Sequence, residues 1–437
     1  MIVEIAITLG LVICFALLIL FGKHFRITDV NQRVWLYLFI LKFFTGALLV
    51  MLYVHYYNPW SADMFKYYRG GEVLYSALDE NPSDYFKMLT GIKGDEPQLH
   101  MYYDAADYWY KQYDYGLYND NRSMIRLNAL LCVFSGGRFF VHVVIMAFLS
   151  FLGSYWLFLA LKKITRFSNK VLIFGVFLIP TVLVWSSGLL KEGLLMFSLG
   201  ALLLTSVKMR EKFNWYQVLI WILSALLMYL TKFYVLLCII PSIIFLWITA
   251  KIRLKKPLVV LTPILLVIVV LLGTSKLYSP IDFPSLIERK QHDFVKFVNS
   301  VDDVGSNIKI PDLEPNFGSL IIHLPNAYFN SFFRPHLGEA PFGLQMLAAV
   351  ENLLFLMLLI LAVACFKKPN NKMRTFIWFA VVYVLFLYGI AGLTTPNLGA
   401  LVRYKMPAMP FLFFALYACI DNKRLPKFLR KFNLFLE

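Results

Sequence analysis

Long apolar stretches separated by short polar segments dominate the pattern of the chain. About eleven of them are roughly 15–25 residues long, close to the length of a helix that crosses the hydrocarbon core of a bilayer. The pattern predicts an all-α fold, a polytopic membrane helical bundle with about 11 transmembrane helices. The expected spans are 3–22, 35–56, 138–161, 171–190, 193–207, 216–231, 234–250, 257–273, 343–366, 375–393 and 404–420.

Two long hydrophilic segments, 57–126 and 274–340, interrupt this pattern. The first contains eleven Asp and Glu against seven Lys and Arg, and it is rich in Tyr and Trp, which favour the headgroup zone. The second opens with a helical pattern over 284–299. We expect two large outer-side loops carrying short interfacial helices, within a single integral membrane domain over 1–437.

The charge distribution predicts how the spans are oriented. The chain is 59% hydrophobic and 16% charged with a net charge of +16, and 23 of its 42 Lys and Arg lie in short segments between spans or in the C-terminal tail. Positive residues accumulate in cytoplasmic loops, so we expect a multi-pass protein of the cytoplasmic (inner) membrane with its N-terminus outside and its C-terminus cytoplasmic. The charge therefore reports orientation, and no nucleic acid partner is expected.

Metal and nucleotide motifs are missing from the sequence. The five Cys and seven His show no metal-ligand spacing, and no phosphate-binding Gly-rich loop occurs. Only His100, Asp104 and Asp107 offer weak candidates for acceptor or metal contacts. We therefore assign no metal ligands and no cofactor, and the involvement of a divalent cation stays open.

A charged pair lies at the tip of a predicted helical hairpin. The fourth expected span contains a Trp-Ser-Ser-Gly motif at 185–188, and Lys191 and Glu192 follow before the fifth span begins. Charges near the membrane are costly unless they are paired or hydrated. Lys191 is a candidate for binding a phosphate, with Glu192 orienting it or its partner; the alternative is a polar tip that snorkels to water.

Asp63 follows the second expected span in an aromatic segment. A helix here would place Asp63 and Tyr67 one turn apart on one face, and Lys66 and Gly70 likewise. A carboxylate just above the outer leaflet can act as a general base on a hydroxyl acceptor, so Asp63 is a candidate for this role. The alternative is an exposed loop aspartate.

Four basic residues are expected at the outer ends of the helices, where the positive-inside bias makes them unusual: Lys191, Lys232, Arg334 and Arg403. Each alone could be an interface anchor. A shared anionic ligand at the outer face would explain the set, and a lipid-linked phosphate is the obvious anion there.

Four short features together resemble multi-pass GT-C-type glycosyltransferases, which use polyprenyl-phosphate sugars at the outer membrane face, and related uncharacterised proteins of bacterial polysaccharide clusters. They are Asp63 with Tyr67 in the first outer loop, the 185–188 motif leading to Lys191 and Glu192, the segment Phe333-Arg334-Pro335, and Arg403-Tyr404 followed by Pro407 and Pro410. The resemblance implies that Asp63 is the catalytic base and that Arg403 holds the lipid phosphate. One departure is that two expected helices precede the Asp63 loop, where the family usually has one.

The predicted function is that of a glycosyltransferase at the outer face of the cytoplasmic membrane, transferring a sugar from a polyprenyl-phosphate-linked donor. The acceptor would be a glycan, lipid or protein in cell-surface polysaccharide synthesis, and the expected partners include membrane lipids. Residues predicted to bind substrate or lipid phosphate are Lys66, Tyr67, Lys191, Glu192, Lys232, Arg334, Arg403 and Tyr404.

Two alternatives stay open. A Wzy-like O-antigen or capsular polysaccharide polymerase or ligase would bind pyrophosphate through outer-face arginines and would need no Asp base. A lipid-linked glycan flippase or transporter is more distant, because transporters tend to place charges near the bilayer midplane in repeated halves, and no internal repeat is visible.

Overall fold

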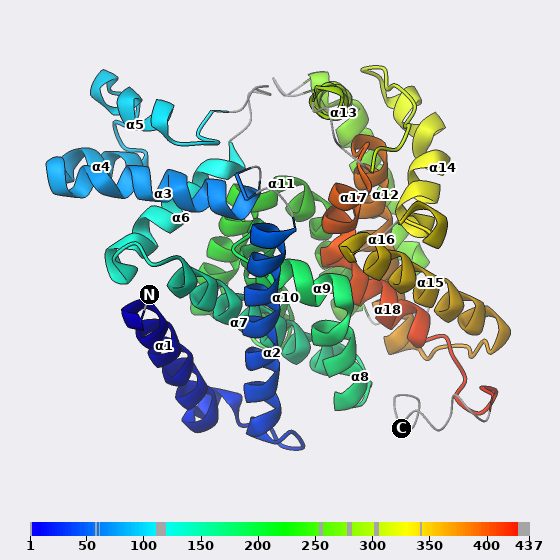
Figure 1. The fold of residues 1–437 in the computed structure, drawn as a ribbon. Coiled ribbons are helices and arrows are strands. Elements are labelled where there is room, and N and C mark those ends of the chain that lie inside the picture. Colours follow the sequence, from blue (N-terminus) through cyan, green and yellow to red (C-terminus); the bar gives the residue numbers. More distant parts are fainter. Residues whose placement is uncertain are drawn as a thin grey trace. The chain divides into compact units, whose positions relative to one another are not determined.

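The computed structural model describes residues 2–56, 59–60, 62–110, 119–252, 257–277, 282–300, 306–340 and 343–426. Helices account for 81% of the structure (Figure 1), and no strand forms among these residues. The expected all-α class is therefore confirmed. Parts of both expected outer loops, and the end of the basic C-terminal tail, lie outside the described residues.

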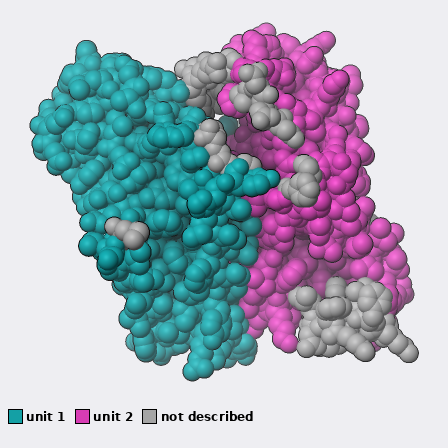
Figure 2. Space-filling model, in the orientation of Figure 1, with its two compact units in different colours: residues 1–156, 183–202, 220–233 teal, residues 157–182, 203–219, 234–437 magenta. Residues whose placement is uncertain are grey.

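The chain divides into two compact units (Figure 2), and each is described by itself. Unit 1 comprises Met1–Trp156, Leu183–Leu202 and Ile220–Phe233, and unit 2 comprises Leu157–Val182, Leu203–Leu219 and Tyr234–Glu437. Unit 1 contains α1 (Ile2–Phe21), α2 (Gln32–His55), α3 (Asp63–Glu80), α4 (Pro82–Thr90), α5 (His100–Ala105) and α6 (Asp120–Ser135), with short helices at Lys23–Phe25 and Pro97–Leu99.

Unit 2 contains α8 (Asn169–Ile173), a π-helical turn (Phe174–Leu178), α12 (Leu258–Gly273), α13 (Phe283–Asn299), α14 (Phe317–Phe333), α15 (Gly343–Ala364), α16 (Asn371–Thr394), α17 (Leu398–Lys405) and α18 (Met409–Tyr417). Its short 3₁₀ helices are Ser275–Leu277, Leu337–Glu339 and Met406–Ala408. The helices with residues in both units are α7 (Phe139–Ile164), α9 (Pro180–Ser187), α10 (Lys191–Glu211) and α11 (Trp215–Ile252).

Seven of the described helices are long and apolar enough to cross a membrane: α1, α2, α7, α10, α11, α15 and α16. The pair Asn169–Leu178 and Pro180–Ser187, bent by 53°, would be an eighth span if its two halves form one. Length and composition thus support a multi-pass membrane protein with fewer clear spans than the eleven expected.

The difference arises at particular places in the chain. The expected spans 216–231 and 234–250 count once, as α11, although non-helical torsion angles at Lys232 (φ −148°, ψ 80°) divide this helix where the sequence predicts a boundary. The span expected at 257–273 forms α12, which has 16 residues. The last expected span is interrupted at Met406–Ala408, and α18 beyond it has nine residues, with Pro410 in its first turn. Pro407 and Pro410 lack the N–H that would continue the preceding helix.

Small residues allow α7 and α10 to approach closely within unit 1. An added Cβ at Gly200 would lie 1.9 Å from the carbonyl oxygen of Gly153, and one at Gly153 would lie 2.3 Å from the carbonyl oxygen of Met196. Membrane helices commonly pack through such residues because they bring the backbones together. The contact fixes the start of α10, which carries two of the predicted site residues.

Candidate functional site

Helices α3 and α6 carry many of the polar residues of the candidate site. An added Cβ at Gly70 would lie 3.1 Å from Ile125, and one at Gly71 would lie 2.5 Å from Cβ of Asn128. Residue numbers rise together along this contact, so the two helices run parallel and their N-termini lie at the same end. Figure 1 shows α3 and α4 running crosswise to α2.

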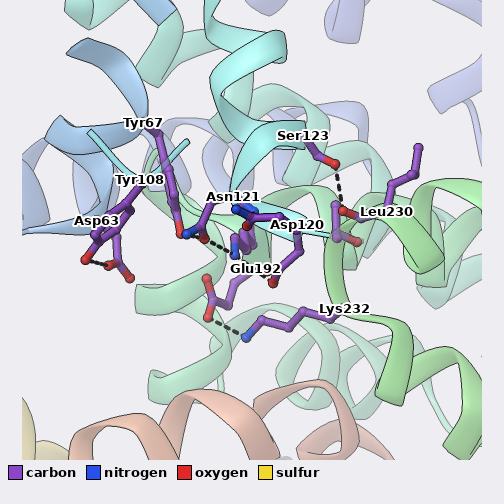
Figure 3. Close-up of polar contacts among 12 residues, drawn as sticks. Asp63, Tyr67, Tyr108, Asp120, Asn121, Ser123, Glu192, Leu230 and Lys232 are labelled. Atoms are coloured by element: carbon purple, nitrogen blue, oxygen red, sulfur yellow. Dashed lines mark hydrogen bonds and ion pairs between the residues drawn. The ribbon is translucent and has the colours of Figure 1, made fainter. Parts of the chain in front are cut away.

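Asp63 is the first residue of α3 and is half-buried. The Tyr108 hydroxyl donates a hydrogen bond to Asp63 Oδ1 at 3.3 Å (Figure 3), and the Lys66 ammonium lies 4.4 Å from the centre of the Tyr108 ring. Tyr108 has a φ of 69°, in the left-handed region where a bulky side chain is strained. Because such strain is often found at functional sites, the contact between Asp63 and Tyr108 is a candidate for function.

A second set of contacts joins α3, α6 and α10. The Tyr67 hydroxyl donates to Asn121 Oδ1 at 3.3 Å, and Lys191 Nζ donates to the same oxygen at 2.6 Å. Lys191 also forms an ion pair with Asp120 at 2.6 Å, and its ammonium lies 5.5 Å from the centre of the Tyr67 ring. Asn119 caps α6 by accepting a hydrogen bond from the Asn121 N–H. This cap helps to place Asp120 and Asn121 against Lys191.

Glu192 forms a buried ion pair with Lys232, with 2.8 Å between Oε1 and Nζ (Figure 3). The Glu192 side chain is 0% exposed and that of Lys232 is 5% exposed. Just before the break in α11, the carbonyl of Leu230 accepts a hydrogen bond from Ser123 Oγ at 2.7 Å. Since a buried charge needs a partner, the interpretation of Glu192 as a tip that snorkels to water does not fit its surroundings.

Arg334, in unit 2, directly follows α14 and pairs with Glu339, with 2.7 Å between Nε and Oε1. Burial alone would raise the pKa of Glu339, but hydrogen bonds from Arg334 and from the backbone N–H of His336 lower it below its ordinary value. The Glu339 carboxylate is therefore ionised at neutral pH and balances the Arg334 charge.

Arg403 and Tyr404 lie near the end of α17, also in unit 2, and both are half-buried. The Tyr404 ring centre lies 5.7 Å from that of Tyr234 and 5.4 Å from the ammonium of Lys290. Lys290 belongs to α13, in the second expected outer loop. The α17 end thus lies in a basic and aromatic environment that includes one cation not predicted from the sequence.

Neither the family models, nor the curated proteins, nor the solved structures compared with the chain give a match. Among the residues that the structure describes, no group of three or more His, Cys, Asp or Glu could hold a metal ion.

The structure brings six predicted site residues together in unit 1: Asp63, Lys66, Tyr67, Lys191, Glu192 and Lys232. The other three, Arg334, Arg403 and Tyr404, lie in unit 2, so a cavity shared by all four predicted cations stays a prediction. Three of those cations already pair with a carboxylate of the chain: Lys191, Lys232 and Arg334. A ligand phosphate at any of them would share its charge with that carboxylate or displace it.

Tyr108, Asp120 and Asn121 were not predicted from the sequence as site residues. A signal for the last two was present, because an Asn-Asp-Asn run at 119–121 before an apolar stretch is typical of a helix start. No comparable signal marks Tyr108, whose importance comes from its torsion angle and from its contact with Asp63.

Proposed function

We propose that the protein is a membrane glycosyltransferase that takes a sugar from a polyprenyl-phosphate-linked donor, with Asp63 as the general base. One observation carries the proposal. A half-buried carboxylate, hydrogen-bonded by a strained Tyr108, begins an amphipathic helix directly after the membrane-spanning candidate α2. Tyr67, one turn along α3, joins the same cluster through Asn121 and Lys191.

In the proposed reaction the hydroxyl oxygen of the acceptor attacks the anomeric carbon of the donor sugar. The bond from that carbon to the phosphate oxygen breaks, and polyprenyl phosphate leaves with inversion at the anomeric carbon. Asp63 accepts the proton of the attacking hydroxyl, a role in which a positioned carboxylate accelerates the reaction by about 10²–10⁴-fold. The Tyr108 hydroxyl holds that carboxylate through its hydrogen bond, and Lys66 contacts the Tyr108 ring.

The experiment uses the full chain in lipid nanodiscs with a panel of radiolabelled polyprenyl-phosphate sugars. Glycan fragments and lipids serve as acceptors, with and without EDTA. We expect transfer from at least one donor, with release of polyprenyl phosphate. If no donor is consumed but labelled donors cross the membrane of proteoliposomes, the transporter alternative replaces the proposal.

Arg403→Ala and Asp63→Asn together separate the transferase from the polymerase alternative. We expect the Arg403→Ala variant to raise the KM for the donor about tenfold, as for the loss of one charged hydrogen bond to the phosphate. Activity that depends on Arg403 but is fully kept by an Asp63→Asn variant would instead favour a polymerase or ligase that acts on lipid pyrophosphates.

We also propose that the first hydrophilic segment faces the outside of the cytoplasmic membrane. The excess of acids there and of bases in the short segments supports this orientation. In a background without Cys14 and Cys419, Ile92→Cys, at a residue 71% exposed, is expected to react with a membrane-impermeant maleimide on intact spheroplasts. Thr28→Cys, also exposed, is expected to react only after permeabilisation, and the reverse pattern would invert the proposed orientation.

A further inference from the structure

Lys42 is a lysine inside the membrane-spanning candidate α2, and its side chain is 0% exposed. Its ammonium donates hydrogen bonds to Ser150 Oγ at 2.9 Å and to Ser186 Oγ at 2.6 Å, and both serines are fully buried. An ionisable side chain inside a membrane bundle is costly and normally has a specific task. The transfer reaction proposed above assigns none to Lys42.

The face of α2 that carries Lys42 contacts the Trp-Ser-Ser-Gly motif at three successive points. Lys42 bonds Ser186, as described, and an added Cβ at Gly46 would lie 2.4 Å from the carbonyl oxygen of Ser187. An added Cβ at Gly188 would lie 2.9 Å from a methyl carbon of Leu49. Positions 42, 46 and 49 lie on one face of a helix, so α2 fixes residues 186–188 along a single stripe.

This contact links two of the chain segments that carry the unit 1 site. Beyond its C-terminal end, α2 leads to Asp63, and residues 186–188 lead directly to Lys191 and Glu192 at the start of α10. We infer that Lys42 is a positioning residue. Through its hydrogen bond to Ser186, it holds the start of α10 in the position in which Lys191 contacts Asp120. Lys42 itself is enclosed and does not touch substrate in this role. The part of the inference that concerns activity rests on the proposed transferase function.

The first test needs no substrate. Lys42→Met keeps the length of the side chain and removes both donated hydrogen bonds, and Ser186→Ala removes one of them. In hydrogen–deuterium exchange on the protein in nanodiscs, we expect the amides of 186–193 to exchange about tenfold faster in both variants. The loss of a hydrogen bond lowers the free energy of local opening, and the typical loss corresponds to about this change in exchange rate. Unchanged exchange in Ser186→Ala would overturn the inference even if Lys42→Met fails to fold.

Ser198→Ala is the matched control. Ser198 is also fully buried, but its hydroxyl bonds the Leu195 carbonyl of its own helix at 3.0 Å. Its replacement is expected to leave exchange at 186–193 unchanged. An equal increase in this control would show a general loosening of the bundle and would also overturn the inference.

The second test uses the transfer reaction. We expect Ser186→Ala to lower kcat about tenfold with little change in the KM for the donor, and we expect the double variant with Lys42→Met to be no worse than Lys42→Met alone. Faster exchange without any detectable transfer would leave the positioning role standing and count against the proposed function. Normal transfer by Ser186→Ala with faster exchange would reject the link to catalysis.

Discussion

An Asp63→Asn variant is expected to lose about 10²–10⁴-fold in kcat for sugar transfer, the usual contribution of a general base. The amide keeps the shape of the side chain and can still accept the Tyr108 hydrogen bond, but it cannot take the proton of the acceptor hydroxyl. The measurement is the initial rate of sugar transfer from the donor identified in the nanodisc assay.

Asp79→Asn is the matched control for this prediction, because Asp79 lies on the same helix and is exposed. That variant is expected to transfer at the rate of the unmodified protein. Native mass spectrometry with the polyprenyl-phosphate sugar separates chemistry from binding, since Asp63→Asn is expected to bind the donor normally. Full activity in Asp63→Asn would remove Asp63 as the base.

Replacing Lys232 by Met is expected to destabilise the protein by about 3–5 kcal/mol, the usual consequence of removing one member of a buried ion pair. Glu192 has no exposed surface from which water could replace the lost ammonium. The effect is measured as the shift in unfolding midpoint in a denaturant titration of the protein in detergent. A further Glu192→Gln replacement is expected to recover part of the loss because it removes the charge that Lys232 balanced.

The control for the Lys232 variant is the pair between Lys163 and Glu211, whose side chains are 39% and 54% exposed. Lys163→Met is expected to change stability by less than about 1 kcal/mol, as for other solvent-exposed ion pairs. If Lys232→Met were as mild as Lys163→Met, the buried pair would contribute little to holding α10 and α11, contrary to the burial described here.

The fold class could be predicted from the sequence because apolar length is a local property. The stretches 3–22, 35–56 and 343–366 became α1, α2 and α15 with similar bounds. The count of spans was less accurate where the helix breaks within an expected span, as at Pro407. The apolar pattern of the sequence does not show such breaks. They depend on the hydrogen-bond partners that the released backbone N–H and C=O groups find in the folded structure.

The candidate site was predicted in part. A helix through this segment was expected to place Asp63 and Tyr67 one turn apart, and α3, which begins at Asp63, has that spacing. The partners of Lys191 and Glu192 were not predicted, because Asp120 and Lys232 lie far away in sequence. Lys42 was visible as a lysine in an apolar run, but its serine partners depend on tertiary packing.

The parallel packing of α3 and α6 has an electrostatic consequence. Each helix has a macrodipole equivalent to about half a positive charge at its N-terminus, and parallel helices place these ends together. The partial charges at the start of α3 and of α6 therefore add, where an antiparallel pair would place opposite ends together. Negative charge near Asp63 and Asp120, including charge that develops on a departing phosphate, would be stabilised by the backbone itself, independently of any lysine or arginine.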